Sequence, residues 1–479
     1  MLFNSLQFAL FLPAVVVVYW LLRHKPPRWQ NLLLLAASYF FYGWWDWRFL
    51  SLIIVVSLTD YLVGRGLAVE ERPGRRRLLL AVSLLVNLGI LGFFKYFDFF
   101  ADSAVQLLGL FGMKASRTTL DVVLPLGISF FTFKSLSYSI DVFRRKCEPT
   151  RDVVAYFAYV AFFPQLFAGP IERAKNLLPQ FLKPRTFDTD EAKDGLRQIL
   201  WGLVKKIAVA DFLAGYVDTV FLTYDHQDGL VLGIGVFLYA IQLYADFSGY
   251  SDIAIGVGKL LGFKTNPNFA CPYFSRNITE FWRRWHISMM SWFRDYIFYP
   301  LGGPFRGKAR WIGYTLVTFA VSGLWHGPDW TFVVWGLLNG LYFIPMILKK
   351  KPPTFTGVVA KKRLLPSLKE TGQMLGTFLL VLLGWVFFRS DSLGQAFGYL
   401  ARMVTHPIMP GQVGYRFYLV PILVCIGLLI IEWIQRRKRH TMQIERLPTW
   451  ARWSIYYILV IGMLLFGTFG GSEFIYFQF

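Results

Sequence analysis

Long apolar runs that recur from one end of the chain to the other constrain its fold more than any other feature. A helix that crosses the hydrocarbon core of a bilayer needs about 20 mostly apolar residues. Hydrophobic residues make up 55% of the chain and charged residues only 16%, whereas about 25% of residues are charged in a typical soluble domain. The sequence therefore predicts an all-α, polytopic membrane protein in which residues 1–479 form one integral-membrane domain.

We expect about 11–12 transmembrane helices from the length criterion. The candidate spans cover residues 6–22, 30–45, 49–63, 78–94, 119–140, 206–222, 229–247, 311–325, 330–348, 371–388, 416–434 and 450–469. The first of them has no charged region before it and no small-residue cleavage site after it, so we interpret it as a retained span rather than a signal peptide. Residues 393–405 are predicted to form an outer interfacial helix.

The charge of the chain is strongly positive, because 50 Lys and Arg stand against 29 Asp and Glu, a net charge of +21. Nucleic-acid binding is one explanation of such a balance, and basic cytoplasmic loops of a membrane protein are the favoured one. The strongest basic clusters all fall on one side of the predicted spans; they are 23–28, 72–77, 144–146, 349–351 and 436–439. If that side is cytoplasmic, both termini are extracytoplasmic.

Two apolar runs do not fit as simple spans, because each has basic residues on both flanks. They are 153–169, which contains Pro164, and 285–301, which leads into the turn P-L-G-G-P. Proline and glycine break helices, and broken helices occur at membrane depth only where protein or a water-filled cavity covers the backbone. We therefore predict two re-entrant or broken helices.

His286 and His326 are the strongest candidates for chemistry among the six histidines of the chain. Both lie in aromatic, apolar surroundings, where an ionisable side chain is costly and marks a functional site by default. A neutral buried imidazole can act as general base toward a hydroxyl. A structural role is the alternative for each. Asp329 follows three residues after His326 and either orients its ring or belongs to a surface turn.

The sequence motifs of other kinds of active site are absent from the chain. No H-x-x-x-H or H-E-x-x-H pattern occurs, and the cysteines Cys147, Cys271 and Cys425 are scattered, so we expect no metal site and no disulfide framework. Phosphate-binding glycine loops and the G-x-S-x-G nucleophile motif do not occur either. We therefore expect no bound cofactor.

Two carboxylates sit in the apolar stretch Q-L-Y-A-D-F-S-G-Y-S-D-I-A-I-G, at Asp246 and Asp252. Intramembrane carboxylates mark ion or substrate pathways, or they pair with cations. We favour structural pairing, with arginines such as Arg283, Arg284 or Arg294 as partners.

The chain ends G-G-S-E-F-I-Y-F-Q-F, immediately after the last predicted span. These aromatic residues can form an interfacial belt. The alternative is that the two glycines let the tail fold back into the outer mouth, where the hydroxyl of Tyr476 would be placed to carry an acyl group.

Several motifs resemble the bacterial branch of the membrane-bound O-acyltransferases, which includes the membrane proteins of alginate O-acetylation and of D-alanyl transfer to teichoic acid. They are P-L-G-I-S-F-F-T-F-K-S-L-S-Y-S-I-D-V-F-R (125–144), F-F-P-Q-L-F-A-G-P-I-E-R (162–173), Y-A-D-F-S-G-Y-S-D-I-A-I-G (244–256), F-W-R-R-W-H-I-S-M-M-S-W-F-R-D-Y-I-F-Y-P-L-G-G (281–303) and S-G-L-W-H-G (322–327). The resemblance extends over the whole chain. Its core motifs lie within about 120–348, and the C-terminal helix and tail within 450–479.

The resemblance implies a ring of helices around a central tunnel with a thinned centre, and acyl transfer from a cytosolic thioester to a hydroxyl. His326 matches the family's catalytic histidine, and His286 matches a second histidine of this branch. The ending F-I-Y-F-Q-F resembles a motif of the small companion protein in D-alanylation, which would make Tyr476 an acyl relay. The residues expected to line the tunnel or contact substrate are Trp325, Asp246, Ser248, Asp252, Trp285, Arg283, Arg284 and Asn277.

The sequence and the resemblance together predict a membrane O-acyltransferase. We expect acetyl-CoA, or an acyl-carrier thioester, as cytosolic donor, and a hydroxyl of an exported or cell-surface polysaccharide as final acceptor, reached directly or through Tyr476 or a partner acyltransferase. In this scheme His326 is the general base and His286 positions the thioester or stabilises charge. The alternatives are a proton-coupled transporter or flippase, for which no internal symmetry is visible, and an acyltransferase that acts on a lipid alcohol.

Overall fold

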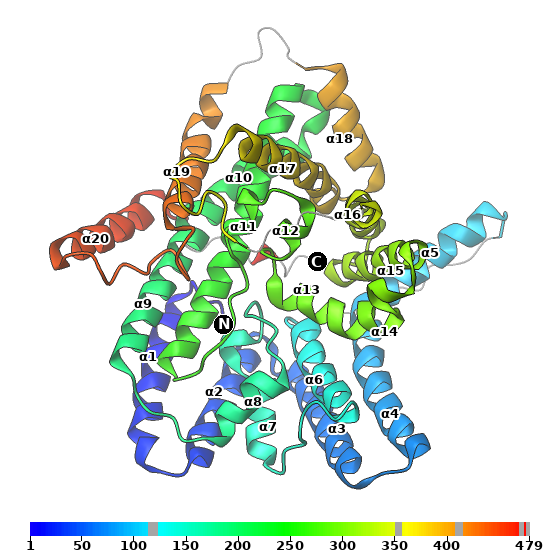
Figure 1. Ribbon diagram of the computed structural model, residues 1–479, viewed down its shortest axis with the longest axis vertical. Coiled ribbons are helices and arrows are strands. Elements are labelled where there is room, and N and C mark those ends of the chain that lie inside the picture. Colours follow the sequence, from blue (N-terminus) through cyan, green and yellow to red (C-terminus); the bar gives the residue numbers. More distant parts are fainter. Residues whose placement is uncertain (114–122, 350–356, 408–414, 469–473, 476–479) are drawn as a thin grey trace. The chain divides into compact units, whose positions relative to one another are not determined.

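The structure is a computed structural model that describes residues 1–113, 123–349, 357–407, 415–468 and 474–475. Within these ranges every regular element is helical (Figure 1). The chain divides into two compact units. The first comprises Met1–Gly195 and Ala254–Asn266, and the second comprises Leu196–Ile253 and Pro267–Phe479.

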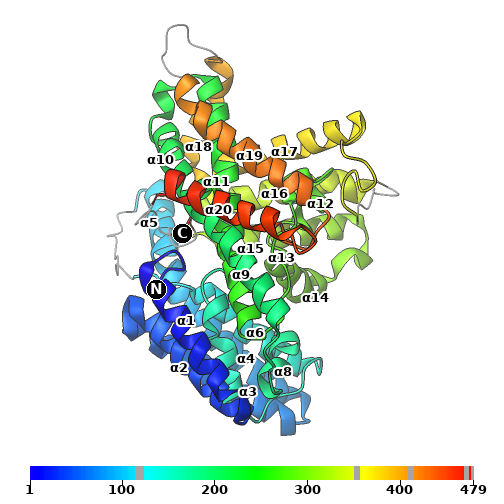
Figure 2. The same cartoon turned by 90° about the vertical axis from the view of Figure 1, so that its left-hand side faces the viewer.

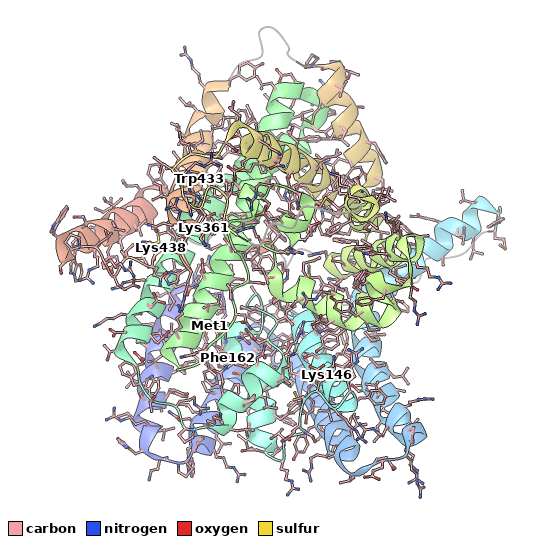
Figure 3. All side chains as sticks on the ribbon, in the orientation of Figure 1. Met1, Lys146, Phe162, Lys361, Trp433 and Lys438 are labelled. Atoms are coloured by element: carbon pink, nitrogen blue, oxygen red, sulfur yellow. The ribbon has the colours of Figure 1, made fainter. Side chains whose placement is uncertain are left out.

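The first unit is built mainly from long antiparallel helices joined by short turns. Its helices are α1 (Leu6–Leu21), α2 (Pro27–Asp46), α3 (Leu50–Val69), α4 (Pro73–Leu91), α5 (Phe97–Leu110), α6 (Ile128–Phe143), α7 (Val153–Val160), α8 (Ala174–Leu182) and the first half of α9 (Thr189–Leu203). Proline opens α2 and α4, where its missing N–H leaves no hydrogen bond unmade. Phe162, which follows α7 and is labelled in Figure 3, packs against Phe181 and Phe263 at ring-centroid distances of 5.4 and 4.8 Å.

A buried carboxylate ties three helices of this unit together. Asp60 of α3 accepts hydrogen bonds from the side chains of Asn87 of α4 and Ser139 of α6, each at 2.8 Å, and from Ser135 of α6. None of these four side chains is exposed. A buried polar group without its partner costs about 1–3 kcal/mol, so these bonds fix the relative register of α3, α4 and α6.

The second unit combines long helices with short, broken ones. Its helices are α10 (Asp211–Leu222), most of α11 (Gly229–Leu260), α12 (Ile278–Trp282), α13 (Ile287–Phe293), α14 (Tyr299–Leu301), α15 (Lys308–His326), α16 (Trp330–Leu348), α17 (Leu368–Arg389), α18 (Leu393–Thr405), α19 (Leu419–Gln435) and α20 (Thr449–Phe466). Two π-helical segments, η5 (Val204–Ala210) and η8 (Arg294–Phe298), interrupt the regular pattern. Helix α20 packs on η5 (Figure 2).

Helices α15 and α16 lie side by side and touch backbone to backbone (Figure 1). A Cβ atom added at Gly323 would lie 2.1 Å from the carbonyl oxygen of Phe332, and one added at Gly336 would lie 2.2 Å from that of Phe319. Glycine is therefore required at both positions, since any side chain would push the helices apart. This contact sits one turn before His326 and fixes the end of α15.

The polytopic all-α architecture predicted from sequence is confirmed. Among the described residues, eight helical stretches are long and apolar enough to cross a membrane, and two of them, Pro27–Val69 and Pro73–Leu110, each contain two of the helices above. Helix α16 covers the predicted span 330–348, and α18 covers the predicted helix 393–405.

Three predicted spans do not meet that criterion, at α6, at η5 with α10, and at α15. The predicted span 119–140 also begins outside the described residues. The physical reason is clearest in α6, which has only 16 residues and is buried almost completely in the first unit together with its serines and Lys134. Both runs predicted to be broken are broken. The first ends its helix α7 after 8 residues and continues as a short 3₁₀ turn, and the second forms α13, η8 and α14.

Candidate active site

His326 is the last residue of α15, and it is held there by the glycine contact between α15 and α16. Gly327 follows in an extended conformation and ends the helix. The imidazole is 2% exposed. Asp329, predicted either to orient this ring or to form a turn, caps α16 instead: its Oδ1 accepts the backbone N–H of Thr331 at 2.7 Å. The carboxylate thus stabilises the start of the next helix.

His286 directly precedes α13, in a left-handed backbone conformation with φ of 43°. A residue with a side chain in this region costs about 1–3 kcal/mol, and such strain gathers at functional sites. The loop before α12 holds it in place: the backbone carbonyl of Asn268 accepts the N–H of Ile287 at 2.9 Å, and Asn268 Oδ1 accepts the Oγ hydroxyl of Ser288 at 2.9 Å. The imidazole itself is fully buried.

The hydrogen bonds of Asn268 select one tautomer of His286. Asn268 Oδ1 lies 3.1 Å from His286 Nδ1, while Asn268 Nδ2 donates to Ser251 Oγ at 3.0 Å. Because an amide oxygen only accepts, Nδ1 must carry the proton, and in the neutral ring Nε2 keeps its lone pair. Within the described residues Nε2 has no hydrogen-bond partner. The site therefore presents a buried proton acceptor to whatever enters it.

The two histidines meet through one tryptophan. The ring of Trp325 lies 6.0 Å from His286 and 4.9 Å from His326, measured between centroids. His326 also contacts Trp335 of α16 and Phe388 of α17, at 5.0 and 5.3 Å. Residues separated by 40 positions in sequence thus share one buried aromatic cluster.

The aromatic cluster continues from Trp325 and Trp335 to Trp385 and Trp285. Trp335 stacks on Trp385 at 5.8 Å, and Trp385 lies 5.1 Å from Trp285. All four indoles are at most 4% exposed. Such surroundings exclude water and strengthen electrostatic interactions inside them.

The predicted residues on α11 form a second, polar group in the same unit. Two glycines, Gly202 and Gly249, bring α11 close to the end of α9, since a Cβ on Gly202 would lie 2.6 Å from the carbonyl oxygen of Gly249. The π-helical segment η5 then widens the helical turn. As a result, the adjacent residues Lys205 and Lys206 are both buried and both reach α11.

Each lysine pairs with one of the predicted carboxylates. Lys205 Nζ lies 2.6 Å from Asp252 and 2.8 Å from the hydroxyl of Ser248, and Lys206 Nζ lies 2.9 Å from Asp246. The carboxylates are therefore paired, but our assignment of arginines as their partners was wrong. Lysines 205 and 206 fill this role because the π-helix turns both of them toward the same helix.

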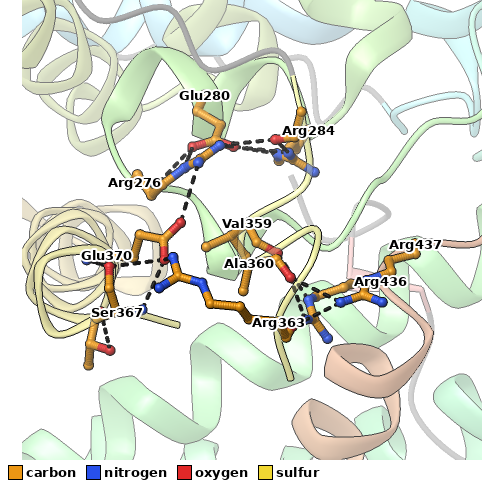
Figure 4. Close-up of polar contacts among 12 residues, drawn as sticks. Arg276, Glu280, Arg284, Val359, Ala360, Arg363, Ser367, Glu370, Arg436 and Arg437 are labelled. Carbon is orange, nitrogen blue, oxygen red and sulfur yellow. Dashed lines mark hydrogen bonds and ion pairs between the residues drawn. The ribbon is translucent and has the colours of Figure 1, made fainter. Parts of the chain in front are cut away.

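The predicted arginines belong to a different network. Arg284 donates to Glu280 at 2.9 Å (Figure 4). Arg284 also donates to the carbonyl of Gly357 at 3.0 Å, and Asn277 caps α12 by accepting the N–H of Glu280 at 2.8 Å. Arg283 is exposed. The bond from Arg284 to Gly357 holds the start of segment 357–367 to α12, and Asn277 stabilises the start of α12.

The other end of that segment is fixed to α19. Arg436 and Arg437 donate to the carbonyls of Ala360 and Arg363 at 2.8–3.2 Å (Figure 4). Trp433, Lys361 and Lys438 mark this junction in Figure 3. Exposed cations therefore gather where segment 357–367 meets the end of α19.

One predicted residue lies outside the described residues, and one important residue was not predicted. Tyr476 is not described, although Phe474 and Ile475 just before it are. Asn268 was missed. It stands 18 positions before His286 in a loop with no motif of its own, and only the fold brings its amide to the ring.

Comparison with known proteins identifies the family. A model of the membrane-bound O-acyltransferase family matches residues 114–381. The chain is 41% identical over 403 residues to "Probable alginate O-acetylase AlgI" of Pseudomonas putida, covering 83% of this chain and 79% of that protein. It is 29% identical over 535 residues to the peptidoglycan O-acetyltransferase of Helicobacter pylori, covering 100% and 98%.

A more distant similarity links the chain to the teichoic acid D-alanyltransferase of Bacillus subtilis, at 30% identity over 232 residues, with 45% of this chain and 57% of that protein covered. The family match covers more than half of the chain and the similarity to the alginate protein most of it. The chain belongs to the membrane-bound O-acyltransferase family and is a multi-pass membrane O-acyltransferase.

Proposed function

We propose that this protein transfers an acetyl group from a cytosolic thioester, acetyl-CoA or an acyl carrier, to a hydroxyl of an exported polysaccharide. The observation that carries the proposal is the buried cluster in which His286 and His326 both contact Trp325. The names of the relatives support a carbohydrate polymer as acceptor, because two of them are acetyl-transferring proteins named for alginate and for peptidoglycan.

In the proposed reaction His326 is the general base. Its imidazole takes the proton of the acceptor hydroxyl as the oxygen attacks the thioester carbonyl, which gives a tetrahedral intermediate. The C–S bond then breaks, the acetyl group stays on the acceptor oxygen, and the thiolate takes the proton back from the imidazolium. General-base catalysis of this kind contributes about 10²–10⁴-fold to the rate.

For His286 the hydrogen bond to Asn268 favours positioning over charge stabilisation. With its proton on Nδ1, the ring offers only an acceptor at Nε2. It can therefore accept a hydrogen bond from the donor, for instance from an amide N–H of a pantetheine arm, but it cannot donate one to an oxyanion while it is neutral. We assign His286 the role of holding the thioester.

The acceptor side of the proposal includes a relay. Tyr476 would receive the acetyl group as an ester and pass it to the polymer or to a partner acyltransferase outside the cell. In this proposal the protein lies in the bacterial cytoplasmic membrane with both termini extracytoplasmic, an orientation that the position of the basic loops supports. Those loops, near 349–363 and 436–439, would attract the phosphates of the donor.

The test is transfer across a reconstituted membrane. The purified protein is placed in liposomes with isotope-labelled acetyl-CoA on one side and a soluble polysaccharide, alginate or a peptidoglycan fragment, on the other. We expect label in the polysaccharide only when protein and thioester are both present, with the partner acyltransferase supplied if the relay requires it. Label in the lipid fraction alone would show that the acceptor is a lipid alcohol, and the proposed acceptor would be wrong.

A further inference from the structure

The last described residues of the chain, Phe474 and Ile475, are bound to the middle of α11. The backbone N–H of Ile475 donates to Asp246 Oδ2 at 2.8 Å, and this bond joins positions 229 residues apart. Both residues are buried, with Phe474 0% and Ile475 5% exposed. These two residues are therefore packed inside the second unit, in a setting where hydrogen bonds to a charged group are strong.

The carboxylate of Asp246, which accepts this bond, also forms an ion pair with Lys206. Lys206 Nζ lies 2.9 Å from Asp246 Oδ1 and 2.7 Å from Asp211 Oδ1. The side chains of these three residues are at most 4% exposed. Lys206 binds one oxygen of Asp246, and the other oxygen, Oδ2, faces the tail.

The side chain of Phe474 connects the tail to the histidine site. Its ring lies 4.4 Å from Tyr250 and 5.7 Å from Phe247, and Phe247 lies 4.6 Å from His286. Phe247 is thus the one ring between the tail and His286 in this series of contacts. The next residue in sequence is Tyr476, the proposed relay.

We propose that Asp246 and Lys206 anchor the C-terminal segment beside the histidine site, and that this anchoring is needed for acyl transfer. Asp246 is a positioning residue in this account, because it touches the tail and not the reacting atoms. The anchoring rests on the contacts alone, whereas its role in transfer rests on the proposed function.

The competing explanation is that the Lys206–Asp246 pair only holds η5 against α11. The chain offers a matched control for it, because the neighbouring Lys205–Asp252 pair joins the same two elements at 2.6 Å. Asp252 also accepts from Gln198 at 2.7 Å. Neither of these contacts involves Phe474 or Ile475, so loss of Asp252 should disturb the helix contact and leave these two residues in place.

The experiment measures how far position 475 is shielded from a thiol reagent in solution. Ile475→Cys is made in a full-length chain in which Cys147, Cys271 and Cys425 are replaced by Ser or Ala, and the rate of maleimide labelling is followed in detergent. The substitution keeps the backbone N–H that binds Asp246. We expect slow labelling in this parent and labelling at least about tenfold faster with Asp246→Leu, the factor that loss of a hydrogen bond to a charged group implies.

Three further variants decide the interpretation. Asp252→Leu should leave labelling slow, Asp246→Asn should give a smaller increase because its oxygen still accepts the amide, and Phe474→Ala should speed labelling without touching the ion pair. Fast labelling of the parent, or an equal increase in Asp246→Leu and Asp252→Leu, would refute the anchor.

Acetyl transfer is measured on the same variants without the Cys substitution. We expect Asp246→Leu and Phe474→Ala to lose transfer together, while Asp252→Leu loses less. Fast labelling in a variant that still transfers acetyl at the wild-type rate would refute the role of the anchor in the reaction. Slow labelling of the Ile475→Cys parent, combined with no acetyl transfer by the wild-type protein, would instead contradict the proposed function and leave the anchor intact.

Discussion

Asn268 gives the sharpest prediction about the site, because it alone decides which nitrogen of His286 is free. In Asn268→Leu the buried Nδ1–H loses its acceptor, which costs about 1–3 kcal/mol. Because Nε2 has no partner among the described residues either, nothing then holds the proton on Nδ1, and the proton can also occupy Nε2, the atom on which the proposed interaction depends. We therefore expect acetyl transfer to fall by about 10–100-fold, the factor that corresponds to roughly 1.4–2.8 kcal/mol.

Asn268→Asp separates this effect from loss of packing. The aspartate keeps an oxygen acceptor for Nδ1, loses the donation to Ser251 Oγ and adds a negative charge beside the ring, so its transfer rate should exceed that of Asn268→Leu and its pH profile should differ from that of Asn268→Leu. The assay is initial rate against donor concentration over a range of pH, since a changed tautomer alters the pH profile and simple loosening does not.

The control is Asn31→Leu in the first unit. Asn31 is as buried as Asn268, at 1% exposure, and holds Phe181 O and Arg185, each at 2.8 Å. It should lower thermal stability with little effect on the pH profile. Equal rates and pH profiles for Asn268→Leu and Asn268→Asp would refute the tautomer argument.

Two other predictions concern stability. Gly323→Ala places a methyl group 2.1 Å from the carbonyl oxygen of Phe332, so it should lower both the melting temperature and the rate of acetyl transfer. The control is Gly313→Ala on the same helix, where the added Cβ meets nothing within 4 Å and neither quantity should change. A Gly323→Ala protein with unchanged melting temperature and transfer would show that the two helices are not in backbone contact. Asp60→Leu removes the acceptor of one Asn87 amide N–H and of the Ser139 hydroxyl, so it should destabilise the first unit by about 2–5 kcal/mol. A melting temperature within error of wild type would contradict the proposed register of α3, α4 and α6.

Local pattern predicted the helices well because apolar runs and their breakers act over short distances. Helix α16 and the interfacial helix α18 have the predicted bounds, and both broken segments were recognised from proline, glycine and flanking charge. Helix α5 was not predicted, because Asp98 and Asp102 interrupt its hydropathy without interrupting its hydrogen bonds.

The partners inside the site were not predictable in the same way. Asp246 and Asp252 were recognised as buried carboxylates that need cations, yet their lysines face them only because η5 is a π-helix. Asn268 reaches His286 only through the loop that precedes α12. A hydropathy pattern indicates which face of a helix is buried, but it does not indicate which polar groups form hydrogen bonds or ion pairs with each other.

The most direct test of the account is the transfer rate of His326→Ala in the reconstituted assay, measured beside His406→Ala, which replaces an exposed histidine of the same unit. The protein should remain folded and monodisperse in both. We predict that His326→Ala loses at least about 100-fold in transfer and that His406→Ala keeps the wild-type rate. Transfer by His326→Ala at a rate close to wild type would contradict the account.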